Sequence, residues 1–501
     1  MVAHKKLLVF LLGISLLLSG CSSPVKKEAS HVTLPPAKAV YQAPVGDENR
    51  SSVYHVLLYL QNRSSGLLEA TAATLSVPSG THPAQAAIER LLSFTGNDTL
   101  KPLSEDASFQ LSQETGFEKT GNTLTLNFDA SMLSLSPADM LGVFRAITNT
   151  ACQFGDIKYV NFLIAGLSPG KDLAASLPLG ACTAGGGFRN SFAQREDGFI
   201  NTTASIYYPA ALGKGVLCES REVSMDTSEL SLMAQSLLDT ISSTPLTLSG
   251  LPDVPSLNSL LQKHIEVEQA SDGRGKVLHL YFLQEFNAAM IEAGIPRSSM
   301  MASITLTLTT FLPNVSAIKV NIGEEEVWTL SPTQIKKLSG QTMHFEQGQM
   351  SRLVFTPFLL ENRTIFLAQG DHLQAVTKAT PITANFSART LFDLLLEGGD
   401  STEIAQGLLS PLPGSIRSSD MVGYALENDV ALINLSQDFL DAVNVLPLRE
   451  AQMCVYSMVN TLCMLPSVNR ARFYVLGSQV EQLENGLYFA GEFLYNPQIV
   501  K

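Results

Sequence analysis

The sequence is poor in the side chains that build catalytic and metal sites. It has eight histidines, six cysteines and one tryptophan in 501 residues. It contains no HExxH motif and no close cluster of histidine, cysteine and carboxylate residues. No lysine follows Gly185–Gly187 at the spacing that a phosphate-binding loop needs. These absences predict a protein that is not an enzyme and that holds neither a cofactor nor a metal.

Basic residues are also few. The chain has 33 lysines and arginines against 46 aspartates and glutamates, which gives a formal net charge of −13 at pH 7. Nucleic-acid binding depends on a basic face that neutralises phosphates, and broad attraction to anionic lipid depends on clustered basic residues. The charge balance therefore predicts no nucleic-acid partner and no general electrostatic contact with a membrane.

The cysteines do not form a recognisable redox or zinc pattern, because no CxxC occurs. Setting Cys21 aside leaves an odd number, so at least one thiol is free or pairs between chains. Two of them lie on one predicted helix about 13 Å apart at 1.5 Å per residue, which exceeds the reach of a disulfide. We favour thiols buried in the core for Cys152, Cys182, Cys218, Cys454 and Cys463.

Only one long apolar run occurs, Leu7–Leu18. It is too short to span a bilayer as a helix, which takes about 20 residues, and it follows two lysines as in a signal peptide. The run ends in Leu18-Ser19-Gly20-Cys21, which resembles the lipobox of bacterial lipoproteins. The resemblance implies that residues 1–20 are a signal peptide and that Cys21 carries a lipid. That lipid would anchor the chain on the extracytoplasmic face of the cell membrane.

The segment after Cys21 is rich in proline, lysine and alanine up to about residue 49. Such a composition cannot bury a core, so residues 21–49 are predicted to be a flexible tether. The alternative interpretation of the N-terminus is an ordinary secretory signal that contains a cysteine by chance.

The remainder shows an internal repeat. Ala146–Gly166 aligns without a gap with Ser457–Gly477, and Ile304–Gly323 is a more diverged copy. Each copy combines apolar residues at helical spacing with a following strand that alternates. Upstream of each copy come a strand pair closed by a turn signal, a further helix, and an extended pair. These extended pairs are Val53–Leu60 with Leu68–Val77, Thr203–Tyr208 with Gly215–Val223, and Leu353–Leu359 with Thr364–Gln374.

Each repeat is therefore predicted to have the order β-β-α-β-β-α-β, in an α/β (α+β) two-layer sandwich. The second helix begins near Ser136-Pro137, Pro296 and Pro447, where proline favours helix initiation. The predicted domains are residues 50–167, 200–345 and 350–501, with a linker at 168–199 that is rich in glycine, alanine and serine.

Tyr456–Leu483, followed by Gly486, resembles the signature of the GerM domain, a sporulation and spore-germination domain. The first repeat fits this pattern but has Phe154-Gly155 at the turn. The second lacks the Asn-Thr pair and carries Thr307-Leu308 instead. Family members are commonly lipoproteins. The resemblance implies a fold akin to ring-building modules and a role in the envelope of a spore-forming bacterium.

Three motifs resemble functional sites. Gly166–Gly170 matches G-x-S-x-G, but a nucleophile elbow needs a helix directly after the serine, and a proline follows Ser168. His279 stands alone in a predicted strand and is interpreted as a core or surface histidine. The Asn-Thr pairs at 149–150 and 460–461 lie at helix ends, where such side chains commonly satisfy free backbone groups, so a structural role is favoured.

These observations together predict a membrane-anchored, non-catalytic scaffold or adaptor with protein partners in the cell envelope. Whether it forms an oligomer stays open. A second hypothesis is a solute- or glycan-binding lipoprotein that uses clefts between domains, although Trp328 is the only tryptophan. A wall hydrolase is the third hypothesis, and it would need converging carboxylates or a metal site.

Overall fold

A computed structural model describes residues 41–105, 108–113, 115–169, 177, 179–184, 199–271, 273–382, 387–466 and 468–501. Cys21 and the predicted signal peptide lie outside these residues. Residues Ala43–Lys501 cluster by contacts into one unit. In the described part of the chain, no helix has both the length and the apolar character needed to cross a membrane.

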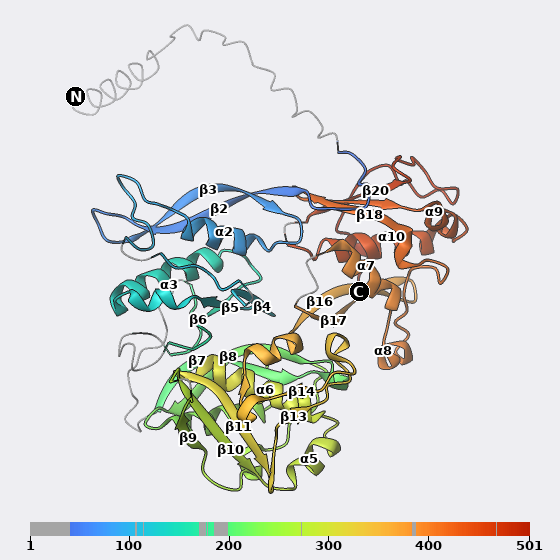
Figure 1. Ribbon diagram of the computed structural model, residues 1–501. Coiled ribbons are helices and arrows are strands. Elements are labelled where there is room, and N and C mark those ends of the chain that lie inside the picture. Colours follow the sequence, from blue (N-terminus) through green and yellow to red (C-terminus); the bar gives the residue numbers. More distant parts are fainter. Residues whose placement is uncertain are drawn as a thin grey trace, which may run out of the picture. The chain divides into compact units, whose positions relative to one another are not determined.

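The unit contains the same series of elements three times (Figure 1). Repeat 1 consists of β2 (Ser51–Gln61), β3 (Leu68–Pro78), α2 (Pro83–Leu92), β4 (Phe117–Thr120), β5 (Thr123–Phe128), α3 (Pro137–Ala151) and β6 (Tyr159–Ile164). Repeat 2 consists of β7 (Phe199–Pro209), β8 (Val216–Asp226), α4 (Leu230–Ile241), β9 (Glu266–Gln269), β10 (Lys276–Phe282), α6 (Arg297–Phe311) and β11 (Val315–Ile322). Repeat 3 consists of β16 (Leu360–Gln369), β17 (His372–Pro381), α7 (Ala388–Glu397), β18 (Met421–Glu427), β19 (Val430–Leu435), α10 (Leu448–Leu462) and β20 (Arg470–Val475).

Short helices are inserted between the shared elements. They are α5 (Phe286–Glu292) in repeat 2, and α8 (Ser401–Ala405) and α9 (Gln437–Asn444) in repeat 3. The order β-β-α-β-β-α-β and the mixed α/β class are thus confirmed. The domain boundaries given above stay a prediction.

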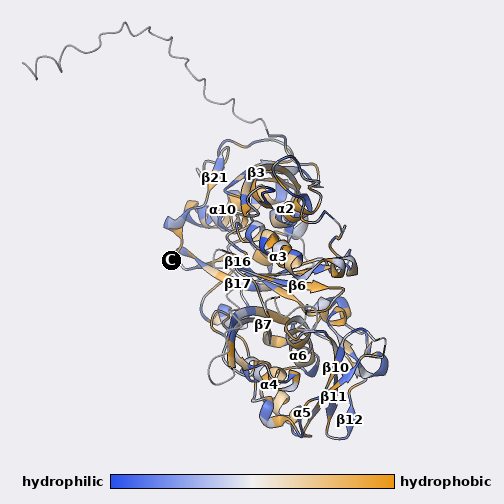
Figure 2. Cartoon of the chain, turned by 90° about the vertical axis from the view of Figure 1, so that its left-hand side faces the viewer, coloured by the Kyte–Doolittle hydropathy of each residue, from blue (hydrophilic) through white to orange (hydrophobic). Residues whose placement is uncertain are grey.

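Within each repeat the sheet has one topology. Its middle strand pairs antiparallel with the strand before it and parallel with the strand after the second helix, giving the orders β4-β5-β6, β9-β10-β11 and β18-β19-β20. A parallel pair needs a crossover connection, and α3, α6 and α10 provide it. Each repeat has its own core of buried apolar side chains. In Figure 2 strand β6 is largely apolar, whereas the edge strand β12 (Glu325–Glu326) is hydrophilic.

The long hairpin of each repeat adds a layer that the sequence pattern did not reveal. The helix pair contacts the sheet on one side and the hairpin on the other, as for α2 and α3 against β2. The hairpin residues Val56, Leu58 and Leu60 are buried, and the residues between them are not. This period of two places one face of the hairpin on the helices, and the opposite face points away from them.

A threonine near the end of the second helix ties the hairpin to the helix in all three repeats. The hydroxyl oxygens of Thr150, Thr307 and Thr461 accept hydrogen bonds from backbone N–H groups of β2, β7 and β16. The donor–acceptor distances are 3.1, 3.0 and 3.1 Å, from Tyr59, Tyr207 and Phe366 respectively. The threonine is therefore the repeated structural element. In repeat 2 it is Thr307, preceded by Leu306 where the other repeats have asparagine.

The helix starts agree with the sequence in part. Ser136 caps α3 through a hydrogen bond from the Asp139 backbone N–H to its Oγ at 3.2 Å, and Pro137 occupies the first turn. Pro296 and Pro447 instead precede the first helical residue, without a side-chain cap.

The predicted pair of strands Leu353–Leu359 and Thr364–Gln374 is wrong, since the second range runs across the turn between β16 and β17. Residues Leu353–Phe358 form a 3₁₀ helix that contains Pro357, and the hairpin consists of β16 and β17. The 3₁₀ turn buries Phe355 and Phe358 on one side, because residues three apart eclipse in this conformation. Just before it, β15 (Met350–Ser351) pairs with β11, so the sheet of repeat 2 includes residues beyond 345.

The end of the predicted tether also takes part in the fold. Strand β1 (Asp47–Glu48) pairs in parallel with β18 of repeat 3. The Arg389 guanidinium donates from Nε to Asp47 Oδ2 at 2.6 Å, and Asn434 Nδ2 donates to the Pro44 carbonyl at 2.9 Å. Gly423 allows this approach, because a Cβ there would lie 2.3 Å from the Gly46 carbonyl oxygen. The segment that leads into repeat 1 is therefore held on repeat 3.

Candidate functional site

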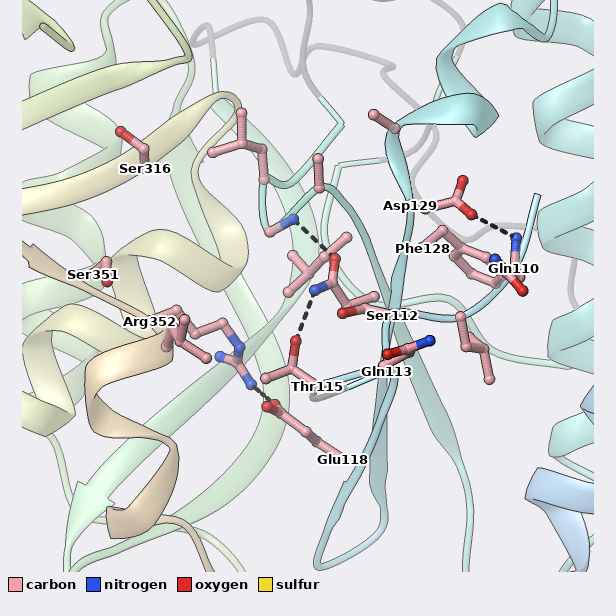
Figure 3. A pocket seen from close by; sticks show the side chains of 18 residues that line it. Gln110, Ser112, Gln113, Thr115, Glu118, Phe128, Asp129, Ser316, Ser351 and Arg352 are labelled. Carbon is pink, nitrogen blue, oxygen red and sulfur yellow. Dashed lines mark hydrogen bonds and ion pairs between the residues drawn. The ribbon is translucent and has the colours of Figure 1, made fainter. Parts of the chain in front are cut away.

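A hollow of about 580 Å³ is lined by residues of repeats 1 and 2. One wall comes from the ends of β5 and β6 and the loop around Ser112, and the other from Ser316 and Ser351–Leu353 (Figure 3). Its size is in the range of small-molecule sites. Its lining is mainly amide, hydroxyl and aliphatic groups: Gln110, Leu111, Ser112, Gln113, Thr115, Asn127, Leu163, Leu167, Ser316, Ser351 and Leu353.

A buried ion pair lies at one side of this pocket. Arg352 donates from Nη2 to Glu118 Oε2, and their side chains are only 9% and 5% exposed. The same guanidinium donates to Thr310 Oγ1 and, at 3.3 and 3.4 Å, to the hydroxyl of Tyr207. Figure 3 shows Arg352 and Glu118 meeting across the two walls.

The guanidinium of Arg352 keeps its charge. Burial opposes the guanidinium charge, but the adjacent Glu118 carboxylate raises the pKa of Arg352 above its usual range. Burial raises the pKa of Tyr207 to about 12, so this hydroxyl stays a neutral partner. The second carboxylate oxygen, Glu118 Oε1, is buried and without a hydrogen-bond partner. Glu118 also lines the pocket, so this oxygen is an unpartnered acceptor at the edge of the hollow.

The neighbouring residue on β4 makes a second buried pair, directed to repeat 3. Lys119 Nζ lies 2.7 Å from Glu361 Oε1 and 3.1 Å from Asp156 Oδ2, and Arg363 Nη2 lies 3.0 Å from Glu361 Oε2. Successive residues of a strand point to opposite faces. Glu118 and Lys119, which are consecutive on β4, therefore join repeat 1 to chain segments on opposite sides: Glu118 to Arg352 and Lys119 to Glu361.

His82 extends this network and also starts a helix. Its Nδ1 accepts from the Ala84 backbone N–H at 3.1 Å, which caps α2, and its Nε2 lies 2.9 Å from Asp156 Oδ2. Burial alone would raise the pKa of Asp156, but the hydrogen bond to His82 and the charge of Lys119 bring this pKa well below its usual range. The network is electrostatically satisfied, as expected for buried charges.

The other polar groups of the pocket support local turns. Asn127 accepts from the Gly166 backbone N–H at 2.8 Å and donates to Thr115 Oγ1 at 2.9 Å. Asp129 accepts from the backbone N–H groups of Gln110 and Ser131 at 3.1 and 3.0 Å. Asn434 repeats the Asn127 contact in repeat 3, where it accepts from Gly477 at 2.9 Å. These residues hold the turn after the last strand of their repeat.

The sequence candidates are not brought together into a chemical site. Within the described ranges, no group of three or more histidine, cysteine, aspartate or glutamate side chains could hold a metal ion. Ser168 is buried and donates to the Phe311 carbonyl at 3.4 Å. His279 bonds Tyr281 and Asn321 on a half-buried sheet face.

The five cysteines that the structure describes are unpaired thiols. Burial raises the pKa of Cys152, Cys218 and Cys463 to about 11 and that of Cys454 to about 12. Burial also raises the pKa of Cys182. Because the thiolate is the reactive form, these groups are poor nucleophiles, in agreement with core thiols. Cys21 lies outside the described residues.

Sequence reasoning missed the two buried ion pairs. Their partners are 234 and 242 residues apart in the chain, so no local spacing signals them. Phe117–Thr120 reads only as a short strand with two charged residues, which by composition is typical of a solvated edge.

One protein-family model matches two of the three repeats. The family model Germane, described as sporulation and spore germination, matches residues 57–168 and 365–481. Repeats 1 and 3 each contain a stretch that matches this family model, and the two stretches together span less than half of the chain. These Germane-like regions point to a role related to sporulation or germination. Repeat 2 lies outside the matched residues but has the same order of elements.

Solved structures give weaker likenesses. The tandem GerMN domains of the sporulation protein GerM from Bacillus subtilis show 16% identity and a TM-score of 0.23, over 60% of this chain and 99% of that one. The first GerMN domain of the same protein shows 21% identity and a TM-score of 0.18, over 23% and 85%. A structure from Clostridium perfringens described as a lipoprotein shows 16% identity and a TM-score of 0.15, over 25% and 80%. No curated protein matches the chain.

Proposed function

We propose that this chain is an exported lipoprotein that acts as a non-catalytic scaffold or adaptor in the envelope during sporulation or germination. Lipid on Cys21 would hold it at the outer face of the cytoplasmic membrane. The proposal draws on the lipobox-like sequence, on the family match, and on the lack, among the described residues, of a histidine, cysteine and carboxylate cluster that could hold a metal.

The observation that carries the scaffold role is how the repeats use their outer faces. The outer face of the repeat 1 sheet is covered by the β7–β8 hairpin of repeat 2. Thr123 Oγ1 lies 2.8 Å from Ser220 Oγ, and Asn161 Nδ2 donates to Ser205 Oγ at 2.8 Å. In repeat 3 the β18 edge takes a strand from the N-terminal lead. Sheet faces and edges of this module thus bind polypeptide, which is the chemistry of an adaptor.

The lipid anchor is tested by labelling. Cells that express the chain would be fed a radiolabelled fatty acid and fractionated, with Cys21→Ser as the matched control. We expect label and membrane association in the parent chain and loss of both in the variant. A chain that is unlabelled, or membrane-bound after Cys21→Ser, contradicts the anchor.

The adaptor role is tested by cross-linking pull-down from sporulating and from growing cells. We expect envelope proteins to be captured reproducibly in the sporulating sample, and less capture when the outer face of a repeat carries a new charge. Recovery of the chain alone in both samples, with monomeric behaviour, contradicts the role.

The pocket favours a second candidate, a lipoprotein that binds a solute or glycan. Its volume of about 580 Å³ would accept a small sugar. However, the only aromatic ring in its lining is Phe128, which is fully buried, so no ring is available to stack on a sugar. Titration of the chain with peptidoglycan disaccharides tests this alternative. Saturable binding of the disaccharide that is lost in Arg352→Ala would support it.

A further inference from the structure

The three hairpins present equivalent outer faces, which differ in how far the described chain covers them. The β7–β8 face, with Ser205 and Ser220, is buried on the repeat 1 sheet. The β16–β17 face is covered in part, because Leu373 bridges to Val500 and the ring of Phe366 lies 5.8 Å from that of Tyr495, whereas Ala375 and Thr377 are exposed. The β2–β3 face has no such cover within the described residues. Val53 and Leu57 are 51% and 40% exposed on it.

The β2–β3 face carries no charged side chain. Its residues alternate with the buried ones on β2 and pair across the hairpin. They are Ser51, Val53, His55, Leu57, Tyr59 and Gln61 on β2, and Leu68, Ala70, Ala72, Thr74, Ser76 and Pro78 on β3. With His55 neutral, this long strip is free of charge in a chain whose net charge is −13.

We propose that the outer face of the β2–β3 hairpin is the contact surface between two copies of this chain, packed face to face about a twofold axis. Twofold dimers are the commonest homo-oligomers, and their interface must be self-complementary. An uncharged sheet face meets this condition, because two copies meet there without bringing their acidic groups into contact. Face-to-face packing of sheets places them about 10 Å apart.

The chain supplies its own example of this kind of packing. The equivalent face of repeat 2 lies against a sheet face, and its small hydroxyl and amide side chains bond across the interface. On β2–β3 the central pair is Leu57 opposite Ala72, so the contact there would be apolar. Leu57 holds its place through the backbone, since its N–H donates to Gln153 Oε1 at 2.8 Å and its carbonyl accepts from Gln153 Nε2 at 2.8 Å.

The area predicts a weak dimer. Each strand has eleven residues with a rise of about 3.3 Å each, and two neighbouring strands are together about 10 Å wide. The face therefore has an area of roughly 360 Å² per copy, or roughly 700 Å² for the two copies. Stable interfaces bury about 1,200 Å² or more. The free chain should therefore be mainly monomeric at low concentration. Confinement of two anchored copies to one bilayer raises their local concentration, as linkage does, and this part of the inference rests on the proposed lipid anchor.

The test is disulfide cross-linking of the full-length lipidated chain in vesicles, with Ala72→Cys at the centre of the face. The matched control is Ile291→Cys, an aliphatic position on α5 that is 80% exposed. The parent chain gives the background from its own thiols. We expect covalent dimers from Ala72→Cys alone, and their loss when Leu57→Glu is added, whereas adding Val445→Glu, at a site 81% exposed elsewhere, leaves them.

Three outcomes would overturn the inference. They are no dimer from Ala72→Cys above the parent background, no loss with Leu57→Glu, and cross-linking of Ala72→Cys to a protein of different mass instead. A fourth is vesicle binding by Cys21→Ser that Leu57→Glu abolishes, which would place the face on lipid. Failure of the anchor itself is read separately, from fatty-acid labelling. In that case the inference predicts Ala72→Cys dimers from the unlipidated chain only at high protein concentration.

Discussion

Repeats 1 and 2 share their layers but differ in the outer face of the sheet. In repeat 1 the face is made of Thr123, Thr125 and Asn161, which are buried under the neighbouring hairpin. In repeat 2 the corresponding face carries His279, Tyr281 and Lys319, which are half-buried. His279 bonds Tyr281 and Asn321 at 2.7 and 2.6 Å, and Tyr281 donates to Glu266 at 2.7 Å. Short side chains accept a neighbour, whereas long hydrogen-bonded ones face solvent.

The comparison teaches that the core and the outer face of this module vary independently. Each repeat buries its own apolar cluster, which maintains the order of elements. The outer faces then determine which repeat lies against which. Repeat 2 keeps the architecture although the family model matches only the other two, as expected if most of its divergence lies outside the shared core.

The largest effect should come from breaking the buried pair between the repeats. Arg352→Met leaves the Glu118 carboxylate buried without a partner, and loss of one member of such a pair costs about 3–5 kcal/mol. The double variant with Glu118→Gln should recover most of this. Urea unfolding followed by circular dichroism measures both. Lys263→Met, in the exposed pair with Glu266 of repeat 2, is the control and should change stability far less, because exposed ion pairs contribute little. Equal losses for Arg352→Met and the double variant would contradict the account.

A smaller effect should be common to all three repeats. Thr307→Val and Thr461→Val each leave a buried backbone N–H of the hairpin unpaired, which costs about 1–3 kcal/mol. Thr150→Val should cost less, because the N–H of Tyr59 is only part-buried. Replacement by serine retains the hydroxyl and serves as the control. Unaltered unfolding midpoints for all three valine variants would show that the threonine is not a structural element.

The covered sheet face of repeat 1 and the outer sheet face of repeat 2 should respond differently to loss of a polar group. Ser205→Ala removes partners of Asn161 and Ser220 at the covered face and should cost about 1 kcal/mol. Asn321→Ala on the outer sheet face of repeat 2 should cost less than about 0.5 kcal/mol, as for surface substitutions. The stability of the two variants is compared by thermal unfolding. A larger loss of stability for Asn321→Ala than for Ser205→Ala would contradict the prediction.

The smallest effect should appear only in acid. The folded-state pKa of Asp156 lies below its unfolded value, so its stabilising contribution is present above the unfolded pKa of about 3.9. It is lost as pH falls further toward the folded pKa. Stability measured between pH 6 and pH 3 should fall less steeply in Asp156→Asn than in the parent chain. Identical slopes would indicate that the contacts with His82 and Lys119 do not persist in solution.

Local patterns predicted the elements well, and distant pairing could not be predicted. The alternation in Ser51–Gln61 and the helical spacing in Leu230–Ile241 depend on neighbours in sequence, so the sequence reveals them. Leu353–Phe358 reads as extended because it is apolar and contains a proline, yet the burial of Phe355 and Phe358 makes it helical. The pairing of β1 with β18 and the contact of Glu118 with Arg352 depend on the packing of one repeat against another, which no local period encodes.

The most direct test of the central claim, that the sheet of one repeat carries the hairpin of the next, is an intramolecular disulfide. Thr123→Cys combined with Ser220→Cys replaces two hydroxyls that lie 2.8 Å apart. The account predicts that this pair forms a reducible cross-link within one chain under mild oxidation, detected by mass spectrometry. It also predicts that Asn321→Cys with Ser220→Cys forms none. Absence of the first cross-link, or formation of the second in its place, would contradict the account.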